Sequence, residues 1–308
     1  MEEVKLRLNN LDLNLLVALD HLIVTKSISQ TAERMNLSQS AMSNALGRLR
    51  QYFDDPLLVR VGQKMELTVR AEILRPEIAD VLTRIEAALA KKPDFDPKQA
   101  SREFRLLVSD YSLHTIIPPV LELTAPFGDH IRFHFLRQTD RPNVYLERGE
   151  ADLLLAPRIV CSPEHPSIKL FDDDYCCVAW RRGKYGRGPL TRKAFAAAGH
   201  VRYLSSPTGG ALDSVLLDQL GITRRTEIST FAFSSVPHLV VGTDRIAVVH
   251  RRTAQLWARH LSISVLELPF PMERFEQQMQ WHHYRSRDPG IIWIRDIFKQ
   301  AAAKMQKK

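Results

Sequence analysis

Apolar residues recur at helical spacing near the start of the chain and predict an amphipathic helix over residues 12–24. Its buried face is expected to consist of Leu15, Leu16, Leu19, Leu22 and Ile23. Two further helices are expected over residues 30–35 and 39–52, with Asn36 ending the first of them in a left-handed conformation. Leu37 is expected to fill the turn between them. Two short helices joined by so tight a turn are typical of a helix-turn-helix.

A serine stands directly before each helix of this motif, and both Ser29 and Ser38 are suitable helix N-caps. In a helix-turn-helix the second helix enters the major groove of DNA with its N-terminal residues leading. Gln and Asn side chains can pair with adenine, and serine can contact several bases. Arginine suits phosphates, and Arg50 lies further along this helix in a position for such a contact. The polar residues expected to contact DNA from this helix are Ser38, Gln39, Ser40, Ser43, Asn44 and Arg48.

A short β-rich segment follows the recognition helix. Two runs between residues 57 and 68 flank a turn that begins at Gly62, a pattern that predicts a hairpin. Such a hairpin beside a helix-turn-helix is a wing, and Arg60 and Lys64 are expected to contact the DNA backbone or the minor groove from it. The N-terminal region is therefore expected to be a winged helix-turn-helix.

A long helical pattern covers residues 69–90, interrupted by Pro76, which should bend the helix. Its apolar positions follow a 4-3-4-3 spacing that is typical of a coiled-coil seam between two chains. The predicted dimerisation residues are Leu74, Ile78, Val81, Ile85 and Leu89, with Ala88 as an alternative to the last. The pattern alone leaves open a second interpretation, in which the helix packs on its own domain.

The pattern of apolar residues changes after a polar linker at residues 91–102, which contains two prolines. Short apolar runs now alternate with helical stretches, a pattern typical of an α/β domain with a parallel or mixed sheet. The apolar runs expected to be strands include 104–108, 131–136, 153–156, 176–180 and 246–249.

The composition adds a few constraints. The formal net charge of +8 favours an anionic partner. Residues 26–70 hold seven basic and four acidic residues, a modest excess, so strong DNA binding is expected to need more than one such domain. No apolar run reaches the roughly 18 residues that span a bilayer, and the N-terminus lacks the pattern of a signal peptide, so a cytoplasmic protein without a membrane partner is expected. The three cysteines, Cys161, Cys176 and Cys177, form no disulfide pattern, and their function stays open.

Residues 27–43 closely resemble the N-terminal signature of the LysR-type transcriptional regulators, as do the wing entry over residues 55–60 and Leu67-Thr68. Thr31, Leu58 and Ser40 depart from that signature, and Ser40 in place of a frequent proline can alter base preference. The resemblance implies a winged helix-turn-helix, a long linker helix through which the family dimerises, and a two-lobed effector domain like the periplasmic binding proteins. The implied boundaries are 1–68, 69–90, 91–102 and 103–308, with lobe I at 103–172 and 270–308 and lobe II at 173–269.

Three stretches resemble a narrower branch of this family, the activators of nodulation genes and of naphthalene and salicylate degradation. They are Phe95-Asp96-Pro97, Gly199-His200-Val201, and Trp281-His282 followed by residues 288–295. The resemblance implies a small aromatic effector, a dimer or tetramer on a pseudo-palindromic site in double-stranded DNA, contact with RNA polymerase, and activation of a nearby operon.

Ligands of open α/β sheets bind in the crevice beyond the strand C-termini, and this rule nominates effector-binding residues by position. The set mixes aromatic, hydroxyl and cationic groups, which suits a flat aromatic ligand carrying an oxygen or a carboxylate. The nominated residues are Ser109, Asp110, Tyr111, Arg158, Ser205, Thr208, Phe231, Phe233 and His250.

Several other functions are less consistent with these motifs than a regulator is. His282-His283 and Cys176-Cys177 lack metal-ligand spacing, and adjacent residues on a strand point to opposite faces, so no metal site is expected. No phosphate-binding glycine motif occurs, so no cofactor is expected, and a hydrolase with a cleft cysteine lacks any motif. The chain is therefore expected not to be an enzyme. A ligand-independent repressor or architectural DNA-binding protein remains the alternative, and a two-lobed transport protein is disfavoured by the helix-turn-helix.

Overall fold

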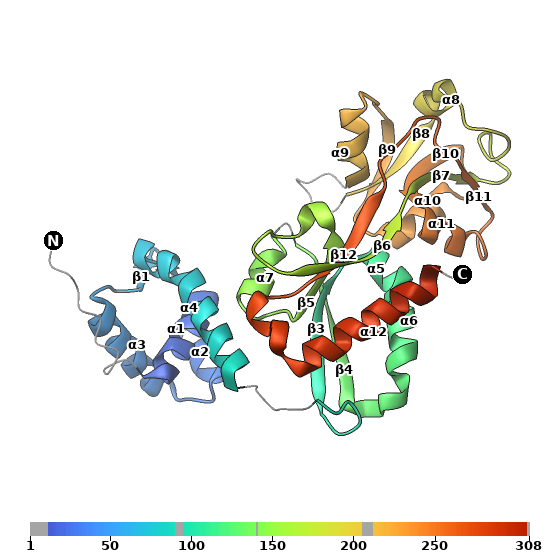
Figure 1. The fold of residues 1–308 in the computed structure, drawn as a ribbon. Helices are drawn as coiled ribbons and strands as arrows, with labels where there is room; N and C mark the ends of the chain where they lie inside the picture. The colour runs from blue at the N-terminus through green and yellow to red at the C-terminus, as the bar shows by residue number, and fades with distance from the viewer. Residues whose placement is uncertain (1–11, 90–94, 140, 205–211, 307–308) are drawn as a thin grey trace. The chain divides into compact units, whose positions relative to one another are not determined.

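The computed structural model describes residues 12–89, 95–139, 141–204 and 212–306. The chain divides into two compact units, residues 1–91 with 147–150, and the rest of the chain from residue 92. Figure 1 shows a small helical unit with a hairpin and a larger unit of strands and helices. Each is described by itself.

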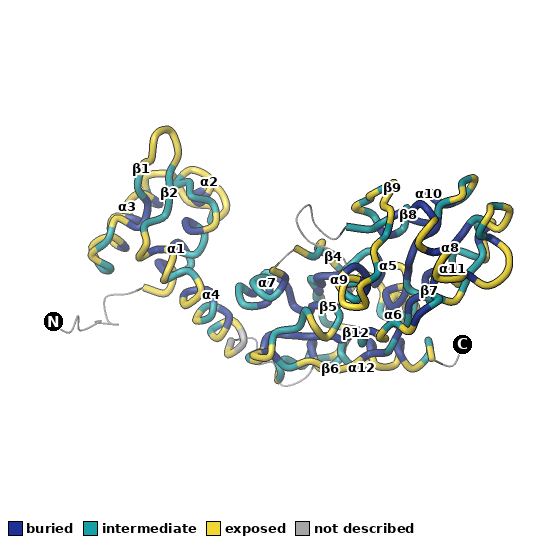
Figure 2. Tube along the Cα trace, turned by 90° about the horizontal axis from the view of Figure 1, so that it is seen from above, coloured by how far each residue is buried: buried dark blue, intermediate teal, exposed yellow. Residues whose placement is uncertain are grey.

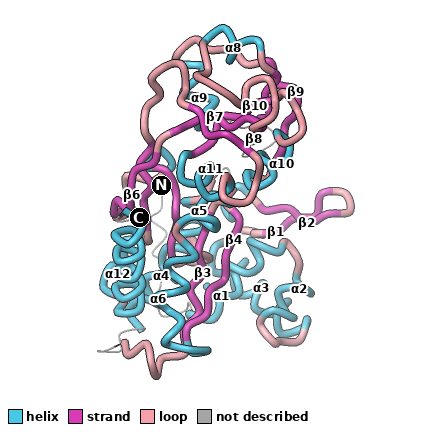
Figure 3. Tube along the Cα trace, turned by 90° about the vertical axis from the view of Figure 1, so that its right-hand side faces the viewer, coloured by secondary structure: helices cyan, strands magenta, loops and turns pink. Residues whose placement is uncertain are grey.

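The N-terminal unit is a three-helix cluster followed by a hairpin and a long helix. Its elements are α1 (Leu13–Thr25), α2 (Ile28–Arg34), α3 (Gln39–Phe53), β1 (Leu58–Val61), β2 (Lys64–Leu67) and α4 (Val69–Leu89). The apolar face of α1, with Leu19 and Leu22, packs on Met42 and Leu46 of α3, and all four are buried. The predicted helix-turn-helix and hairpin are confirmed, and Figure 3 shows the hairpin projecting from the helices of this unit.

The turn of the motif differs from the prediction in two details. Ser27, not Ser29, caps α2, because its hydroxyl accepts a hydrogen bond from the Gln30 N–H, so the helix begins at Ile28. Asn36 is left-handed as expected, with φ of 53°. Leu37 does not fill the turn: its side chain is 45 % exposed, and its N–H instead closes the turn by donating to the Ala32 carbonyl.

The wing is tied to the recognition helix by Arg50. Its guanidinium donates to the carbonyl oxygens of Pro56 and Leu58, at 2.8 and 3.0 Å. The Asp55 carboxylate accepts from the Leu57 N–H and from the Thr68 hydroxyl, at 2.7 and 2.6 Å. Arg50 therefore holds the start of the hairpin against α3, and its contact with a phosphate stays a prediction.

Helix α4 has one face buried in its own unit and apolar side chains exposed elsewhere. Ile78 is buried in the core formed with α1 and α3, and Leu74 packs against that core. Ile78 thus belongs to the chain's own core and not to an exposed seam. Val81 is exposed, Ile85 is half-buried, and the Leu89 side chain lies outside what the structure describes. Exposed apolar residues that the spacing did not select are Val69 and Ile73.

The C-terminal unit contains two five-stranded mixed sheets. The first has the order β4-β3-β5-β12-β6, in which β3 pairs parallel with β4 and β5, while β12 runs antiparallel to β5 and β6. Its strands are β3 (Arg102–Val108), β4 (Ile131–Arg137), β5 (Leu153–Pro157), β6 (Ser167–Asp173) and β12 (Phe275–Gln280). Leu106, Leu107 and Leu153–Ala156 are fully buried because helices cover both faces of its centre.

The second sheet has the order β11-β7-β10-β8-β9, with β8, β9 and β10 parallel and β7 antiparallel to β10 and β11. Its strands are β7 (Tyr175–Trp180), β8 (Gly199–Tyr203), β9 (Arg225–Thr230), β10 (Arg245–His250) and β11 (Ile263–Leu266). Figure 2 shows buried strands within each lobe beneath partly exposed helices. The predicted α/β architecture with a mixed sheet is confirmed.

Helices surround both sheets. They are α5 (Asp110–Thr115), α6 (Ile117–Thr124), η2 (Ala125–His130), α7 (Asn143–Glu147), η3 (Arg158–Val160), α8 (Arg192–Ala197), α9 (Leu212–Gln219), η4 (Phe233–Ser235), α10 (Val236–Val240), α11 (Arg251–Trp257), η5 (His283–Arg287) and α12 (Pro289–Gln306). Helices α6 and α12 lie side by side along the first sheet (Figure 1). Among the described helices, none has the length and apolar character needed to cross a membrane.

The chain passes between the two sheets twice, from β6 to β7 and from β11 to β12. The first crossing is a single residue, Asp174, and it is held from both sides. The Tyr111 hydroxyl donates to the Asp173 carboxylate at 2.7 Å, and Arg251 donates to the Asp174 carboxylate at 3.0 Å. This crossing therefore connects residues at the start of α5 with residues at the start of α11.

Candidate functional site

The eight predicted DNA-contact residues, which we call the recognition surface, are all exposed. Six belong to α3 and its cap, and Arg60 and Lys64 belong to the wing. The Ser38 hydroxyl accepts from the Ala41 N–H at 3.1 Å and lies 3.0 Å from the Ser40 hydroxyl, so it fixes the helix start. Gln39, Ser43 and Asn44 present exposed side chains on the next turns of the helix, as base contacts require.

Several cations of the N-terminal unit have partners within the unit. Lys26 forms an ion pair with Glu66 of the wing, and this bond lowers the pKa of the Glu66 carboxyl. Arg50 is occupied by backbone carbonyls, and Arg60 donates to the Gly62 carbonyl at 3.2 Å. Arg48 and Lys64 remain exposed on the surface that carries the polar residues.

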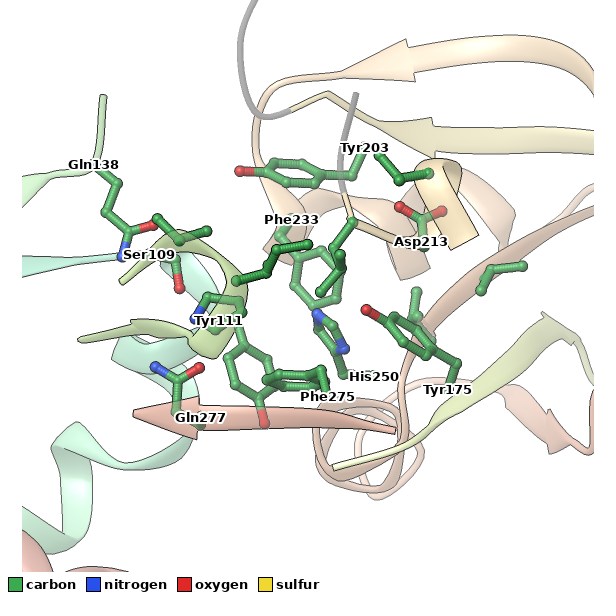
Figure 4. A pocket seen from close by; sticks show the side chains of 17 residues that line it. Ser109, Tyr111, Gln138, Tyr175, Tyr203, Asp213, Phe233, His250, Phe275 and Gln277 are labelled. Atoms are coloured by element: carbon green, nitrogen blue, oxygen red, sulfur yellow. The ribbon is translucent and has the colours of Figure 1, made fainter. Parts of the chain in front are cut away.

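A cavity of about 360 Å³ lies between the two sheets of the C-terminal unit, and we call it the effector cavity (Figure 4). It receives side chains from both sheets, including Tyr175 and Phe275, the first strand residues after the two crossings. Its lining consists of Ser109, Tyr111, Gln138, Pro157, Ile159, Val160, Tyr175, Tyr203, Leu212, Asp213, Val215, Phe233, Val248, Val249, His250, Phe275 and Gln277.

Four of the nominated effector residues line this cavity: Ser109, Tyr111, Phe233 and His250. The Ser109 hydroxyl also caps α5, accepting from the Ser112 N–H at 3.3 Å. The Tyr111 hydroxyl is bonded to Asp173, so its ring is the part of the side chain that faces the cavity (Figure 4). Two further nominated residues, Ser205 and Thr208, lie outside the described residues.

Three nominated residues do not line the cavity. Phe231 is 75 % exposed, because it stands in the loop after β9. The Asp110 carboxylate accepts from the Ser234 N–H at 2.7 Å and pairs with His114, so it joins the two lobes. Arg158 lines a neighbouring, more charged pocket, together with Arg274. Position after a strand placed these residues near the crevice but could not determine which way each side chain points.

Aromatic rings enclose His250 at the centre of the cavity. Its ring centroid lies 4.5 Å from those of Tyr111 and Phe275, 4.9 Å from that of Tyr175 and 5.2 Å from that of Phe233. Burial lowers the pKa of His250 to about 3, so the imidazole is neutral at physiological pH. A neutral imidazole offers one donor and one acceptor.

Two buried polar atoms in this cluster have no hydrogen-bond partner among the described residues: His250 Nδ1 and Tyr175 Oη. Buried polar groups without a partner are costly, and in native proteins they commonly mark a place where another molecule binds. Burial also raises the pKa of the Tyr175 phenol, which stays protonated. Both atoms have almost no accessible surface, so a ligand oxygen would pair with them only after the surrounding rings move.

The described lining contains no lysine or arginine, and its one carboxylate, Asp213, is paired with Arg224 at 2.7 Å. Because a buried anion needs a cation or several donors, this environment favours a ligand that is neutral. It offers apolar faces for an aromatic ring and hydroxyl, amide and imidazole groups for uncharged oxygens.

Residues that the sequence argument missed include Tyr175, Phe275 and Gln277. Tyr175 and Phe275 are the first strand residues after the two crossings between the lobes, and Gln277 lies two residues further along β12. A signal was present, since an aromatic residue directly follows the acidic run at 172–174 and another opens the last strand. The missing information was that these two segments lie next to each other.

The cysteines offer no activated nucleophile. Cys176 and Cys177 are buried in β7, and burial raises the pKa of Cys176 to about 12. Cys161 is half-buried, and burial raises its pKa to about 11. A thiol reacts as its thiolate, so these three groups are unreactive near neutral pH.

His282 and His283 do not lie on a strand, so the expectation that they point to opposite faces is wrong. They follow the end of β12, and their rings are stacked, with centroids 4.7 Å apart. His165, more than a hundred residues away in the chain, stands beside both. Adjacent residues at the end of a strand can thus share one side.

Comparison with known proteins agrees with this architecture. Residues 13–72 match the bacterial regulatory helix-turn-helix of the lysR family, and residues 97–303 match the LysR substrate binding domain. Nodulation protein D 1 of Mesorhizobium japonicum is 35 % identical over 97 % of this chain and 96 % of its own length. Nodulation protein D 3 of Rhizobium leguminosarum bv. phaseoli is 36 % identical over 97 % of this chain and its whole length.

Full-length CbnR in complex with its target DNA has the same fold. It superposes with a TM-score of 0.59 at 14 % identity, covering 96 % of this chain and all of CbnR. The two family matches together cover most of the sequence. The first covers the unit with the exposed polar helix, and the second covers the unit with the enclosed cavity. The chain belongs to the LysR family of bacterial transcriptional regulators, which are DNA-binding proteins with an effector-binding domain and not enzymes.

Proposed function

We propose that this regulator is an activator controlled by a small, neutral, oxygen-bearing aromatic molecule bound in the effector cavity. The observation that carries the proposal is the ring-lined cavity with two unpartnered polar atoms, His250 Nδ1 and Tyr175 Oη, and no cation in its described lining. The volume of about 360 Å³ falls within the range of small-molecule sites.

The geometry also supports a route from the cavity to the lobe crossing. Tyr111 contributes its ring to the cavity and its hydroxyl to Asp173, directly before the crossing at Asp174. The neighbouring residue, Asp110, joins the lobes through the Ser234 N–H. A ligand that packs on Tyr111 better in one arrangement of the lobes than in the other would shift the population toward that arrangement.

The assembly is part of the same proposal. The domains are those implied by the resemblance: DNA-binding domain 1–68, linker helix 69–90, hinge 91–102 and effector domain 103–308. Val69, Ile73 and Val81 leave apolar surface exposed on α4, which fits a helix that pairs with a second copy. A dimer or tetramer would place recognition helices on a pseudo-palindromic site in cytoplasmic DNA, next to RNA polymerase. The likeness to nodulation proteins D supports the assignment to that branch, and the target operon stays open.

A matched pair of ligands tests the proposal. We expect methyl salicylate or an uncharged flavone to bind the full-length protein and salicylate to bind at least tenfold more weakly, because only the latter carries a charge into the cavity. Binding is measured by calorimetry, and function by a reporter and a gel-shift with and without ligand. If no uncharged aromatic binds and DNA binding is complete without any ligand, the ligand-independent repressor is the better description.

A further inference from the structure

Three histidine side chains come together at one edge of the first sheet, outside the effector cavity. We call His165, His282 and His283 the histidine cluster. One nitrogen from each ring lies within 4.8 Å of the others. The Nδ1 atoms of His165 and His283 are 3.5 Å apart. His165 and His282 are buried, whereas His283 is exposed, so the cluster is open to solvent on one side.

The cluster is built by Gln280, the last residue of β12. Its side-chain amide donates to the carbonyls of Ser162 and His165, at 2.7 and 3.1 Å, and its oxygen accepts from the Ser162 N–H at 3.0 Å. The loop before β6 is thereby clamped to the end of β12. The chain then leaves the strand, with His282 at the cap of η5, so the rings of His282 and His283 stack beside His165.

We propose that the histidine cluster is a binding site for a divalent transition-metal ion of the zinc type. Zinc binds imidazole nitrogen at about 2.0–2.1 Å in tetrahedral geometry, which places ligand nitrogens about 3.4 Å from one another. The His165–His283 distance already has this value, and the third nitrogen needs a shift of about 1 Å or slightly more. The cluster contains no carboxylate, so it suits zinc, copper or nickel and does not suit magnesium or calcium.

Two features of the surroundings bear on this proposal. The His282 Nδ1 accepts from the Tyr284 N–H at 3.3 Å, and metal binding through either nitrogen of His282 gives up that contact, which its length makes a weak one. The nearby guanidinium of Arg285 forms a buried ion pair with Asp152, so its charge is already compensated. Exposure of His283 leaves room for a water molecule or another ligand as the fourth donor.

The site would link two segments that Gln280, the Trp281 N–H bonded to the Pro166 carbonyl, and the pairing of β12 with β6 already hold together. The loop that carries His165 begins directly after Val160, which lines the effector cavity together with Pro157 and Ile159. A metal ion bound only by the folded protein raises its thermal stability by mass action. We therefore expect the ion to fix one wall of the effector cavity and to stabilise the C-terminal unit.

The test uses the full-length protein without a histidine tag, titrated with Zn²⁺ in equilibrium dialysis and with Co²⁺ by visible absorption. We expect one ion per chain at micromolar or tighter affinity, a nitrogen-ligand Co²⁺ spectrum, and a higher Tm with Zn²⁺. His283→Ala, at an exposed position, should weaken binding at least tenfold and remove the rise in Tm; His165→Gln should act likewise.

The matched control is His260→Ala, which removes an exposed histidine elsewhere in the same unit. It should leave Zn²⁺ affinity unchanged. The proposal would be overturned if His283→Ala does not weaken Zn²⁺ binding, or if His260→Ala weakens it as much as His283→Ala does. It would also be overturned if binding needs millimolar Zn²⁺. Effector binding is measured separately, so failure of the metal site leaves the proposed function standing.

Discussion

The recognition surface and the effector cavity differ in how their residues are spread along the chain and in how deeply those residues are buried. The eight polar residues of the recognition surface come from one stretch, residues 38–64, and all are exposed. The lining of the effector cavity is drawn from residues 109–277, and its central groups are enclosed by rings. On the first surface each contact must replace water, whereas in the second two central polar atoms, His250 Nδ1 and Tyr175 Oη, are buried without a partner among the described residues.

This difference predicts how each region tolerates change. A residue of the recognition surface can be substituted with little effect on folding, because surface substitutions are usually within about 0.5 kcal/mol. In the effector cavity, folding and binding are coupled, since His250 Nδ1 and Tyr175 Oη are buried without a partner among the described residues. Removing such an atom should therefore favour the ligand-free fold while weakening ligand binding.

The largest expected effect lies outside both regions, on α4. Ile73→Asp combined with Val81→Asp places four charges in the proposed interface of a dimer, where unpaired charges are very costly. We expect loss of dimers and of specific DNA binding together, while the monomer stays folded because both positions are exposed. Light scattering, a gel-shift and circular dichroism measure the three properties.

The matched control on α4 is Ile78→Val, at the position buried in the chain's own core. It should lower stability by about 0.5–1.5 kcal/mol without changing the oligomer. An unchanged oligomer in the double aspartate variant would show that the exposed face of α4 is not the interface.

The next effect concerns the recognition surface alone. Gln39→Ala and Ser43→Ala should each weaken specific binding by about 1–3 kcal/mol if they contact bases, and the melting temperature should stay unchanged because both are exposed. Gel-shifts with the target site and with a scrambled site give the specific and non-specific affinities. Equal losses on both DNAs would mean that these residues contact only the backbone, which would weaken the contrast between the two regions.

The N-terminal unit was predictable because its information is local. Helix caps, the left-handed Asn36 and the apolar face of α1 act within a few residues, so pattern and propensity identify them. Even there, the roles of Arg50 and Ile78 depended on which surface each side chain met. Arg50 binds two carbonyls across the wing, and Ile78 packs on α1, neither of which spacing alone can show.

The effector cavity and the histidine cluster required knowledge of long-range neighbours. The strand-end rule found Tyr111 and His250, because it follows from sheet topology. It could not find Phe275, which reaches the cavity from a strand that returns after the second lobe, and it selected Phe231, which points to solvent. His165 meets His282 because β12 pairs with β6 and Gln280 clamps the loop before β6 to the end of β12.

Substitutions in the effector cavity should have smaller effects. They should lower the affinity for the effector and raise the stability of the ligand-free protein. His250→Phe and Tyr175→Phe keep the rings and remove the unpartnered atoms, so we expect each to weaken effector binding by about 1–3 kcal/mol and to raise Tm of the ligand-free protein slightly. Calorimetry with the best uncharged aromatic and thermal melts without ligand measure both. Phe231→Ala, outside the cavity, should change neither the affinity nor DNA binding. A lower Tm together with unchanged affinity would show that the two atoms serve the fold and not a ligand.

The smallest expected effect is a pH dependence at the lobe crossing. Burial raises the pKa of Asp173 to about 6, although the Tyr111 hydroxyl and the Asp174 N–H bonded to it act in the opposite direction. The unfolded chain has the ordinary, lower pKa, so between about pH 4 and pH 6 the folded protein holds a proton that the unfolded chain has released. Stability contributed by this group is therefore lost as the pH rises through that window.

Asp173→Asn removes this titration and keeps an oxygen that can accept from Tyr111. Because one pKa unit corresponds to about 1.4 kcal/mol, we expect the wild type to lose on the order of 1 kcal/mol relative to the variant between about pH 5 and about pH 7.5. Denaturant unfolding of both proteins at the two pH values gives the difference. Curves that stay parallel would mean that Asp173 ionises normally. The crossing next to the effector cavity would then be solvated much as the recognition surface is, and the contrast between the two regions would not extend to the crossing.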